Sequence, residues 1–318
     1  MSEYKALKGT KIKTFATDLS GESAEGQVFF STAPQFNALK TVVKIDSWAS
    51  GGNLNSARHA LSGFGTQTAG LAAGGQTTAN SEEYDGSSWT EGNNLASTRF
   101  YAGGAGTQTA ALIFGSYPNA VTTEEYGGTS WTSGGNLNTG RALLGGAGTQ
   151  TAGLAFGGNS DPPITNASEE YNGSSWTEGN NLNTARQSMA GFGTQTAALA
   201  AAGATDTDRV VSAEEYNGTS WSNVNNANTA RNGLAGGGIQ TAGLIFGGLT
   251  ATALTGATET YDGTTFVSVG SMATARRILA GAVSAPNTAG LGFGGYGPTT
   301  AATEEYTFGF PLKTLTDS

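Results

Sequence analysis

The stretch EEYNGSSWTEGNNLNTAR at residues 169–186 is almost a copy of EEYDGSSWTEGNNLASTR at residues 82–99. Looser copies run through the rest of the chain, and their aromatic position recurs at spacings of 41, 42, 45, 45 and 45 residues. That position holds Trp48, Trp89, Trp131, Trp176, Trp221 and Phe266. A repeat of this length indicates an architecture in which successive units pack against one another.

Other features keep the same register in every repeat. An arginine follows each aromatic position by ten residues, giving Arg58, Arg99, Arg141, Arg186, Arg231 and Arg276. Next comes a GTQTA turn, which becomes GIQTA at residue 238 and SAPNTA at residue 284. A short apolar run then ends in small residues, mostly a glycine pair. The repeat closes on a carboxylate-rich element that ends in Tyr84, Tyr126, Tyr171, Tyr216, Tyr261 or Tyr306.

Each repeat reads as four short strands separated by turn signals. In the first repeat, strand A is RHALSGFG, strand B is TAGLAAGG, strand C is SEEYDG and strand D is SSWTEGNNL. The DG, NG or GG between strands C and D predicts a two-residue type I′ turn. Small residues in strand B are expected where inner strands converge on an axis. Four strands in about 45 residues are typical of a propeller blade.

The repeat count also predicts how the ring closes. Strands A, B and C occur six times, but the sixth tyrosine is followed by TFGFPLKTLTDS, which lacks the tryptophan phrase. Trp48 has no strand A, B or C before it. We therefore predict an all-β, six-bladed propeller in which residues 42–50 supply the outer strand of the last blade. The expected parts are an N-terminal arm (1–41), the propeller (42–310) and a tail (311–318), with a strand, turn and strand at residues 25–45.

Charge and composition exclude several classes of protein. Residues 1–46 hold six of the seven lysines, so the remainder of a chain with net charge -9 is strongly acidic. Such a body repels phosphates, which argues against a nucleic-acid partner. The absence of cysteine excludes disulfides, thiolate zinc sites and a cysteine nucleophile. No apolar run is long enough for a signal peptide or a membrane span, so we expect no membrane insertion.

The order of arginine, apolar run, double glycine, glutamate-tyrosine and tryptophan resembles the kelch repeat over residues 48–306. The start LKGTKIKTF, the strand EGQVFF and the near-verbatim repeats are similar to kelch-type virion proteins of tailed, notably marine, bacteriophages. The resemblance implies a structural protein located in the virion and made in the host cytoplasm. It also implies several copies per particle, attached to other virion proteins through residues 1–41.

We expect no enzyme activity, cofactor or metal. Kelch-like copper oxidases use histidine ligands and a cysteine-linked tyrosine, whereas this chain has one histidine, His59, and no cysteine. The glutamate pairs, such as Glu82 with Glu83, recur in nearly every repeat, and strand alternation sends their two carboxylates to opposite sides. We therefore interpret them as packing and solvation residues. A glycan-cleaving enzyme is the least favoured alternative.

Strand alternation also assigns the connections to two faces. The A–B and C–D turns share one face, here called the turn face, whose sequence is nearly constant. The B–C and D–A connections share the other, the loop face, where QTTANS, YPNAVTT, NSDPPITNAS, ATDTDRVVSA, LTATALTGAT and YGPTTAAT differ in every blade. Variable loops on a constant scaffold are typical of a binding surface. The arm and the tail are expected to leave from the turn face.

Two readings of the six arginines stay open at this stage. Each guanidinium is either bonded within its own blade to a glutamate or to loop carbonyls, or the six form a positive ring at the channel mouth that binds acidic sugars, phosphates or carboxylates. The predicted function is host recognition by the loop face, with a surface glycan or protein as receptor. The alternative is a head or tail decoration protein that reinforces the particle through the turn face and the arm.

Overall fold

The structure is a computed structural model that describes residues 13–15, 28–31, 38–42, 45–160, 163–283, 287–309 and 312–314. Within these ranges every regular element is a β-strand. The chain divides into two compact units, residues 47–306 and residues 1–46 with 307–318, and each is described by itself.

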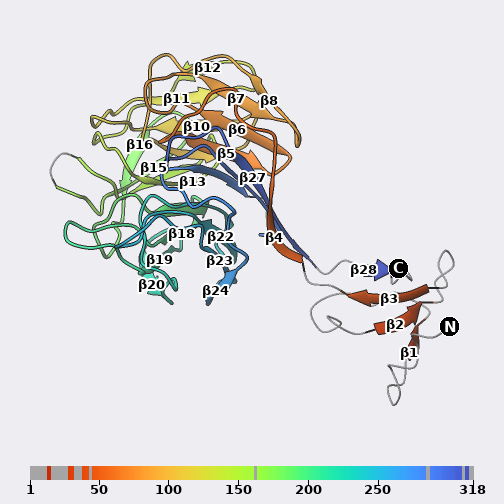
Figure 1. The fold of residues 1–318 in the computed structure, drawn as a ribbon. Coiled ribbons are helices and arrows are strands. Elements are labelled where there is room, and N and C mark those ends of the chain that lie inside the picture. The colour runs from red at the N-terminus through yellow and green to blue at the C-terminus, as the bar shows by residue number, and fades with distance from the viewer. Residues whose placement is uncertain are drawn as a thin grey trace. The chain divides into compact units, whose positions relative to one another are not determined.

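The larger unit is a six-bladed β-propeller (Figure 1), as the sequence predicts. The first two blades are β5 (Ser62–Thr66), β6 (Ala69–Ala73), β7 (Ser81–Tyr84) and β8 (Trp89–Glu91), then β9 (Gly103–Gly106), β10 (Ala111–Phe114), β11 (Thr123–Tyr126) and β12 (Trp131–Ser133). The third and fourth are β13 (Gly145–Gly148), β14 (Gly153–Phe156), β15 (Ser168–Tyr171) and β16 (Trp176–Gly179), then β17 (Ala190–Thr194), β18 (Ala197–Ala201), β19 (Ala213–Tyr216) and β20 (Trp221–Val224). The fifth is β21 (Ala235–Ile239), β22 (Ala242–Phe246), β23 (Thr258–Tyr261) and β24 (Phe266–Val269).

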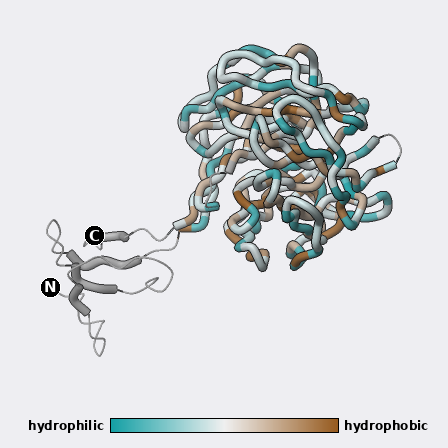
Figure 2. Tube along the Cα trace, turned by 180° about the vertical axis from the view of Figure 1, so that it is seen from behind, coloured by the Kyte–Doolittle hydropathy of each residue, from teal (hydrophilic) through white to brown (hydrophobic). Residues whose placement is uncertain are grey.

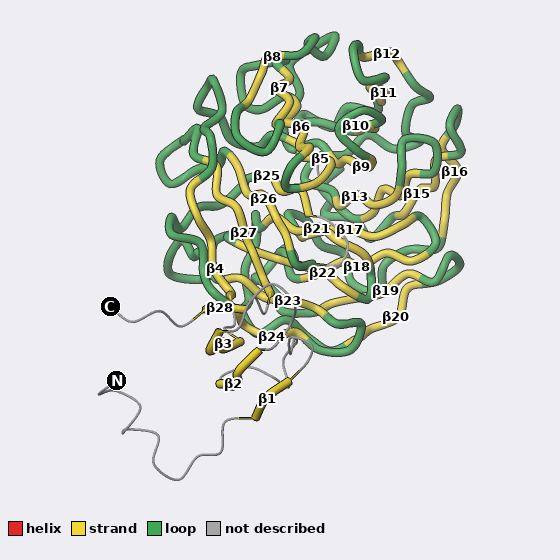
Figure 3. The backbone as a smooth tube through the Cα atoms, turned by 90° about the vertical axis from the view of Figure 1, so that its right-hand side faces the viewer, coloured by secondary structure: helices red, strands yellow, loops and turns green. Residues whose placement is uncertain are grey.

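The sixth blade closes the ring as predicted. Its strands are β25 (Ala280–Val283), β26 (Ala289–Phe293), β27 (Thr303–Gly309) and β4 (Ile45–Ser50), with β4 as the outer strand. In Figure 3 the six A strands surround the axis, and the D strands lie at the periphery. Hydrophobic segments are spread around the propeller (brown in Figure 2), because several separate core clusters lie between adjacent blades.

Two polar contacts recur across the spaces between blades. A tyrosine hydroxyl at the end of strand C donates to the second glutamate of the preceding blade, as Tyr171 does to Glu125 at 2.5 Å. Burial first, and then the hydrogen bond to glutamate, raise the pKa of Tyr171 to about 12. The turn glutamine also reaches backwards, and the amide of Gln195 donates to the carbonyls of Gly153 (3.0 Å) and Tyr171 (2.7 Å). Equivalent glutamine bonds start from Gln67, Gln108, Gln150 and Gln240.

A third contact links strand D to strand C of the preceding blade. Each tryptophan indole N–H donates to a serine or threonine hydroxyl at 2.9–3.1 Å, in the pairs Trp48–Thr258, Trp89–Thr303, Trp131–Ser81, Trp176–Thr123 and Trp221–Ser168. The sixth tryptophan position is Phe266, and the residue that would face it is Ala213, in the same core cluster. Donor and acceptor are thus both missing at the same interface, which leaves no buried polar group without a partner there.

The structure corrects three details of the sequence prediction. Strand A begins at Ser62 and not at the arginine, because Ala60 has a φ of 59° that interrupts an extended strand. Backbones of neighbouring blades approach one another in strand A and not in strand B: a Cβ on Gly63 would lie 2.6 Å from the carbonyl oxygen of Gly281 in the neighbouring blade, whereas one on Gly70 would meet the side chain of Leu291. The C–D turn is not type I′, since Gly86 has a positive φ of 95° and Asp85 does not.

The C–D turn is instead an Asx turn. The Oδ1 atom of Asp85 accepts the backbone N–H groups of Ser87 and Ser88, both at 2.8 Å. These bonds lower the pKa of Asp85 to about 2. The same position accepts the same bonds through Asn172, Asn217 and Asp262 in other blades. An aspartate or asparagine therefore precedes the glycine because its side-chain oxygen accepts the backbone N–H groups of the turn.

The smaller unit contains a sheet in the order β1 (Lys13–Phe15), β2 (Val28–Ser31), β3 (Ala38–Val42) and β28 (Leu312–Thr314). The β2–β3 pair is antiparallel and confirms the two predicted strands, while the predicted turn between them lies outside the described residues; β1 pairs with β2 in parallel. The other residues of the predicted arm (1–41) and tail (311–318) lie outside the described ranges.

We expect Asp85→Asn to leave stability unchanged at pH 7, because asparagine already makes this turn in two other blades. The folded pKa of Asp85 lies below its ordinary value of 3.8, so its contribution is present above about pH 4 and is lost as the pH falls towards 2. Urea denaturation at pH 5, 4, 3 and 2 tests this. The variant should lose less stability than wild type across that range, and equal losses would contradict the assignment.

Phe266→Trp should lower the free energy of unfolding by about 1–3 kcal/mol, because its indole N–H would face Ala213 without an acceptor. Adding Ala213→Ser should recover about 1 kcal/mol by supplying the hydroxyl. A double-mutant cycle measured by chemical denaturation, with Ala213→Ser alone as the fourth corner, separates this bond from any steric cost of the larger ring. Additive effects in that cycle would refute the hydrogen-bond explanation.

Candidate functional site

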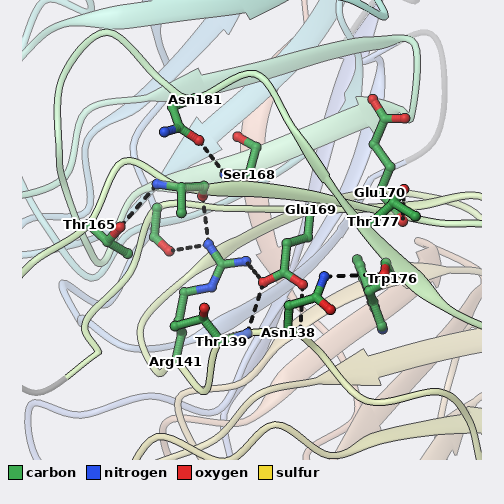
Figure 4. Close-up of polar contacts among 12 residues, drawn as sticks. Asn138, Thr139, Arg141, Thr165, Ser168, Glu169, Glu170, Trp176, Thr177 and Asn181 are labelled. Carbon is green, nitrogen blue, oxygen red and sulfur yellow. Dashed lines mark hydrogen bonds and ion pairs between the residues drawn. The ribbon is translucent and has the colours of Figure 1, made fainter.

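The six predicted arginines are buried, with relative exposures of 0–2%. In the third blade (Figure 4) Arg141 donates from Nη2 to Oε1 of Glu169 at 2.8 Å. Its Nη1 donates to the carbonyls of Gly157 and Ala167 at 3.2 and 2.6 Å. The same glutamate accepts the backbone N–H of Asn138 at 2.7 Å through Oε2. One ion pair therefore joins strand C, the base of the B–C loop and the preceding D–A loop.

The arrangement recurs in all six blades, with N–O distances of 2.7–3.2 Å in the pairs Arg58–Glu82, Arg99–Glu124, Arg141–Glu169, Arg186–Glu214, Arg231–Glu259 and Arg276–Glu304. Burial lowers the pKa of Arg141, and the charge of Glu169 acts in the opposite direction. These contacts match the first of the two interpretations of the arginines, in which each guanidinium is bonded within its own blade. The six side chains present almost no surface to a ligand.

The glutamate pairs divide as strand alternation predicts. The first carboxylate of each pair binds the arginine of its own blade, as Glu169 binds Arg141, and the second accepts the tyrosine hydroxyl of the next blade, as Glu170 accepts that of Tyr216 at 2.6 Å. In the fifth blade the second position is Thr260. Each pair thus sends its two carboxylates to different neighbours. Among the described residues no three His, Asp or Glu side chains gather closely enough to hold a metal ion.

A closed ring of hydrogen bonds surrounds the channel mouth on the loop face. The residue two positions after each arginine donates its backbone N–H to the carbonyl of the equivalent residue in the preceding blade, at 2.6–2.9 Å. The six residues are Ala60, Tyr101, Leu143, Ser188, Gly233 and Ile278. All have a φ between 45° and 63°, in the left-handed region. For the non-glycine members this costs of the order of 1–3 kcal/mol each, which the closed ring must offset.

Side-chain identity varies at this constrained ring. Sequence variation continues at the residue directly after each arginine, in His59, Phe100, Ala142, Gln187, Asn232 and Arg277. In each blade, the residue directly after the arginine forms a backbone hydrogen bond with the first residue of the B–C loop. Those loop residues are Gln76, Tyr117, Asn159, Ala204, Leu249 and Tyr296. We call these eighteen positions the mouth surface; fourteen of them are at least partly exposed, and Ala60, Ala142, Ala204 and Gly233 are buried. Their backbones repeat from blade to blade, while no two blades carry the same three side chains.

The mouth surface has two unlike halves. Blades three, four and five have long B–C loops that close through additional backbone bridges, Asn159–Ile164, Ala204–Arg209 and Leu249–Leu254. Blades six, one and two have shorter loops and carry the aromatic side chains. Phe100 lies 5.6 Å from Tyr101 and 5.4 Å from Tyr117, measured between ring centroids, and Tyr117 is 56% exposed. Between the halves, a cavity of about 100 Å³ is lined by leucines, Met189, Ile278 and Tyr101.

The only histidine lies in the aromatic half. His59 is T-stacked against Tyr296 at 5.3 Å, and its Nδ1 lies 3.0 Å from the hydroxyl of Thr299. The guanidinium of Arg277 lies over the same tyrosine ring at 5.6 Å. Partial burial lowers the pKa of His59, a hydrogen bond with Gln76 raises it, and the charge of Arg277 lowers it further. The sequence predicts that His59 lies in strand A, and this prediction is wrong because β5 begins three residues later, at Ser62.

The comparisons with known proteins add no family. No protein-family model matches this chain, and no curated protein sequence matches it at a significant level. None of the described residues forms a helix long and apolar enough to cross a bilayer.

Sequence reasoning found the variable B–C loops but missed two of the three mouth positions in each blade. The sequence does contain a signal for these positions. The two residues after the six arginines are HA, FY, AL, QS, NG and RI, so the repeats stop being identical directly after the invariant arginine. Only the structure places these residues around the channel mouth beside the loops.

Arg186→Met should lower the free energy of unfolding by about 3–5 kcal/mol, because it leaves the carboxylate of Glu214 buried without its partner. The double variant Arg186→Met with Glu214→Met should be far less destabilised, since neither charge remains. Guanidinium denaturation of the two variants and wild type measures both effects. If the double variant is as unstable as the single one, the cost comes from lost packing and not from the unpaired charge.

Proposed function

We propose that this chain is a recognition protein of a bacteriophage particle and that its mouth surface binds a glycan on the host cell. The observation that carries the proposal is the contrast between an invariant backbone ring and side chains that differ in every blade. Structural requirements alone account for the repeated residues, because the repeats use them in ion pairs and interblade bonds. The side chains of the mouth surface take no part in those repeated contacts, so they are free to vary and to contact a ligand.

The chemistry of the aromatic half favours a sugar as ligand. Exposed tyrosine rings offer flat apolar faces with polar edges, and such side chains are well suited to partly polar ligands at a wet interface. The exposed Tyr296 contacts His59, which lies beside the hydroxyl of Thr299 and forms a hydrogen bond with the side chain of Gln76. A sugar ring presents an apolar face and several hydroxyls, which matches both kinds of group. We expect binding without turnover.

Attachment to the particle completes the proposal. The kelch-like repeat and the N-terminal phrases similar to those of tailed phages support a virion protein held through residues 1–41. Several copies on one particle would convert weak individual contacts into firm attachment, since linked sites raise the effective concentration of the ligand. The turn face, which the decoration alternative would use, owes much of its constancy to the glutamine bonds between blades. Its invariance therefore does not require a docked shell protein.

The test is binding of the purified full chain to host cells and to a glycan array. We expect Tyr117→Ser to reduce binding at least fivefold, because it removes the most exposed aromatic side chain of the loop face. The matched control is Ile239→Ser, which removes an exposed apolar side chain from the turn face and should change binding less than twofold. Equal losses in the two variants, or no binding to cells or glycans at all, would refute the proposal.

A further inference from the structure

The free cations of the propeller all lie on the loop face. Residues 47–306 contain eight arginines, no lysine and eighteen acidic residues. Six of the arginines are neutralised in the buried pairs with glutamate. The other two are Arg209, in the B–C loop of the fourth blade, and Arg277, on the mouth surface of the sixth. In the described part of the chain neither has an acidic partner within ion-pair distance, although the body as a whole is strongly negative.

Arg277 is held in place by its surroundings. Its backbone pairs with that of Tyr296 in both directions, at 3.0 and 2.8 Å, and its guanidinium lies over the Tyr296 ring at 5.6 Å. His59 of the first blade contacts Tyr296 edge-on and lies within hydrogen-bonding distance of the Thr299 hydroxyl. A guanidinium fixed on an aromatic ring keeps donors free for a planar anion and loses little side-chain entropy on binding it.

We propose that Arg277, His59, Tyr296 and Thr299 form a subsite for the carboxylate of an acidic sugar residue, such as a uronate. This assignment rests on the proposed function and names the class of sugar that the mouth surface selects. Arg277 pairs with the carboxylate, and the 43% exposed ring of Tyr296 lies beside it to contact the sugar ring. The imidazole of His59 and the hydroxyl of Thr299 supply hydrogen-bonding groups for the adjacent sugar hydroxyls.

Charge selectivity follows from the surrounding field. An acidic polymer is repelled by the body of this propeller, so its binding depends on a local positive group that is not already paired. Arg209 is less suited to this role, because its Nε already donates to Oδ1 of Asn232 at 3.1 Å and its loop also contains Asp206 and Asp208. Arg209 therefore serves as the matched control for Arg277: the same side chain on the same face, in a different chemical setting.

The experiment compares two oligosaccharides that differ only in the carboxylate. A trisaccharide of galacturonate and the corresponding trisaccharide of galactose are titrated into the full chain by calorimetry. We expect the uronate to bind at least tenfold more tightly than the neutral sugar. Arg277→Gln should remove that preference, and Arg209→Gln should leave the preference in place. A preference that survives Arg277→Gln overturns the proposal.

Further arms separate the possible failures. If host glycans bind the mouth surface but the uronate has no advantage, the subsite is wrong and the proposed function stands. If neither sugar binds and the host-cell and array tests also fail, the proposed function fails with it. An acidic tripeptide with a blocked N-terminus is the remaining probe, and tighter binding of that peptide than of the uronate would overturn the assignment to a sugar. Circular dichroism of each variant confirms that the fold is retained.

Discussion

The buried pair between arginine and glutamate is the interaction on which the loop face depends. In each blade the guanidinium pairs with a carboxylate on strand C and donates to a backbone carbonyl, while the carboxylate also accepts a backbone N–H from the preceding D–A loop, as Glu169 does from Asn138. A buried ion pair contributes little net stability over an apolar substitute, but it tolerates very little displacement of its partners. Its main effect here is to fix the bases of two loops relative to one strand, six times around the axis.

That fixed base explains how variable residues coexist with a regular backbone. The residue two positions after each arginine enters a closed ring of hydrogen bonds in which each N–H binds the carbonyl of the preceding blade. Leu143 and Ile278 adopt positive φ values of 57° and 45° there, which such side chains rarely do. The ring constrains the backbone without restricting side-chain identity to glycine, so the mouth surface can change its chemistry while keeping its geometry.

The spaces between blades follow a similar logic of matched partners. Indole and hydroxyl, tyrosine and glutamate, and glutamine and carbonyl meet across them, each satisfying a group that the apolar clusters would otherwise bury unpaired. The interface between the fourth and fifth blades is instructive, because Phe266 and Ala213 replace both members of one pair together. At this interface the polar contact is absent together with both of its partners.

The sequence by itself determined the number of blades, the four strands in each and the closure by the strand around Trp48, because these follow from a period and a count. It also predicted that the two carboxylates of a glutamate pair diverge, which alternation along a strand requires. The adjacent residues Arg276 and Arg277 show where sequence reasoning ends. Both are arginines, yet the first is buried against Glu304, 28 residues away, and the second lies over Tyr296 on the mouth surface. Only the tertiary structure shows these different environments, because burial depends on partners that the ring brings together and not on the residue type alone.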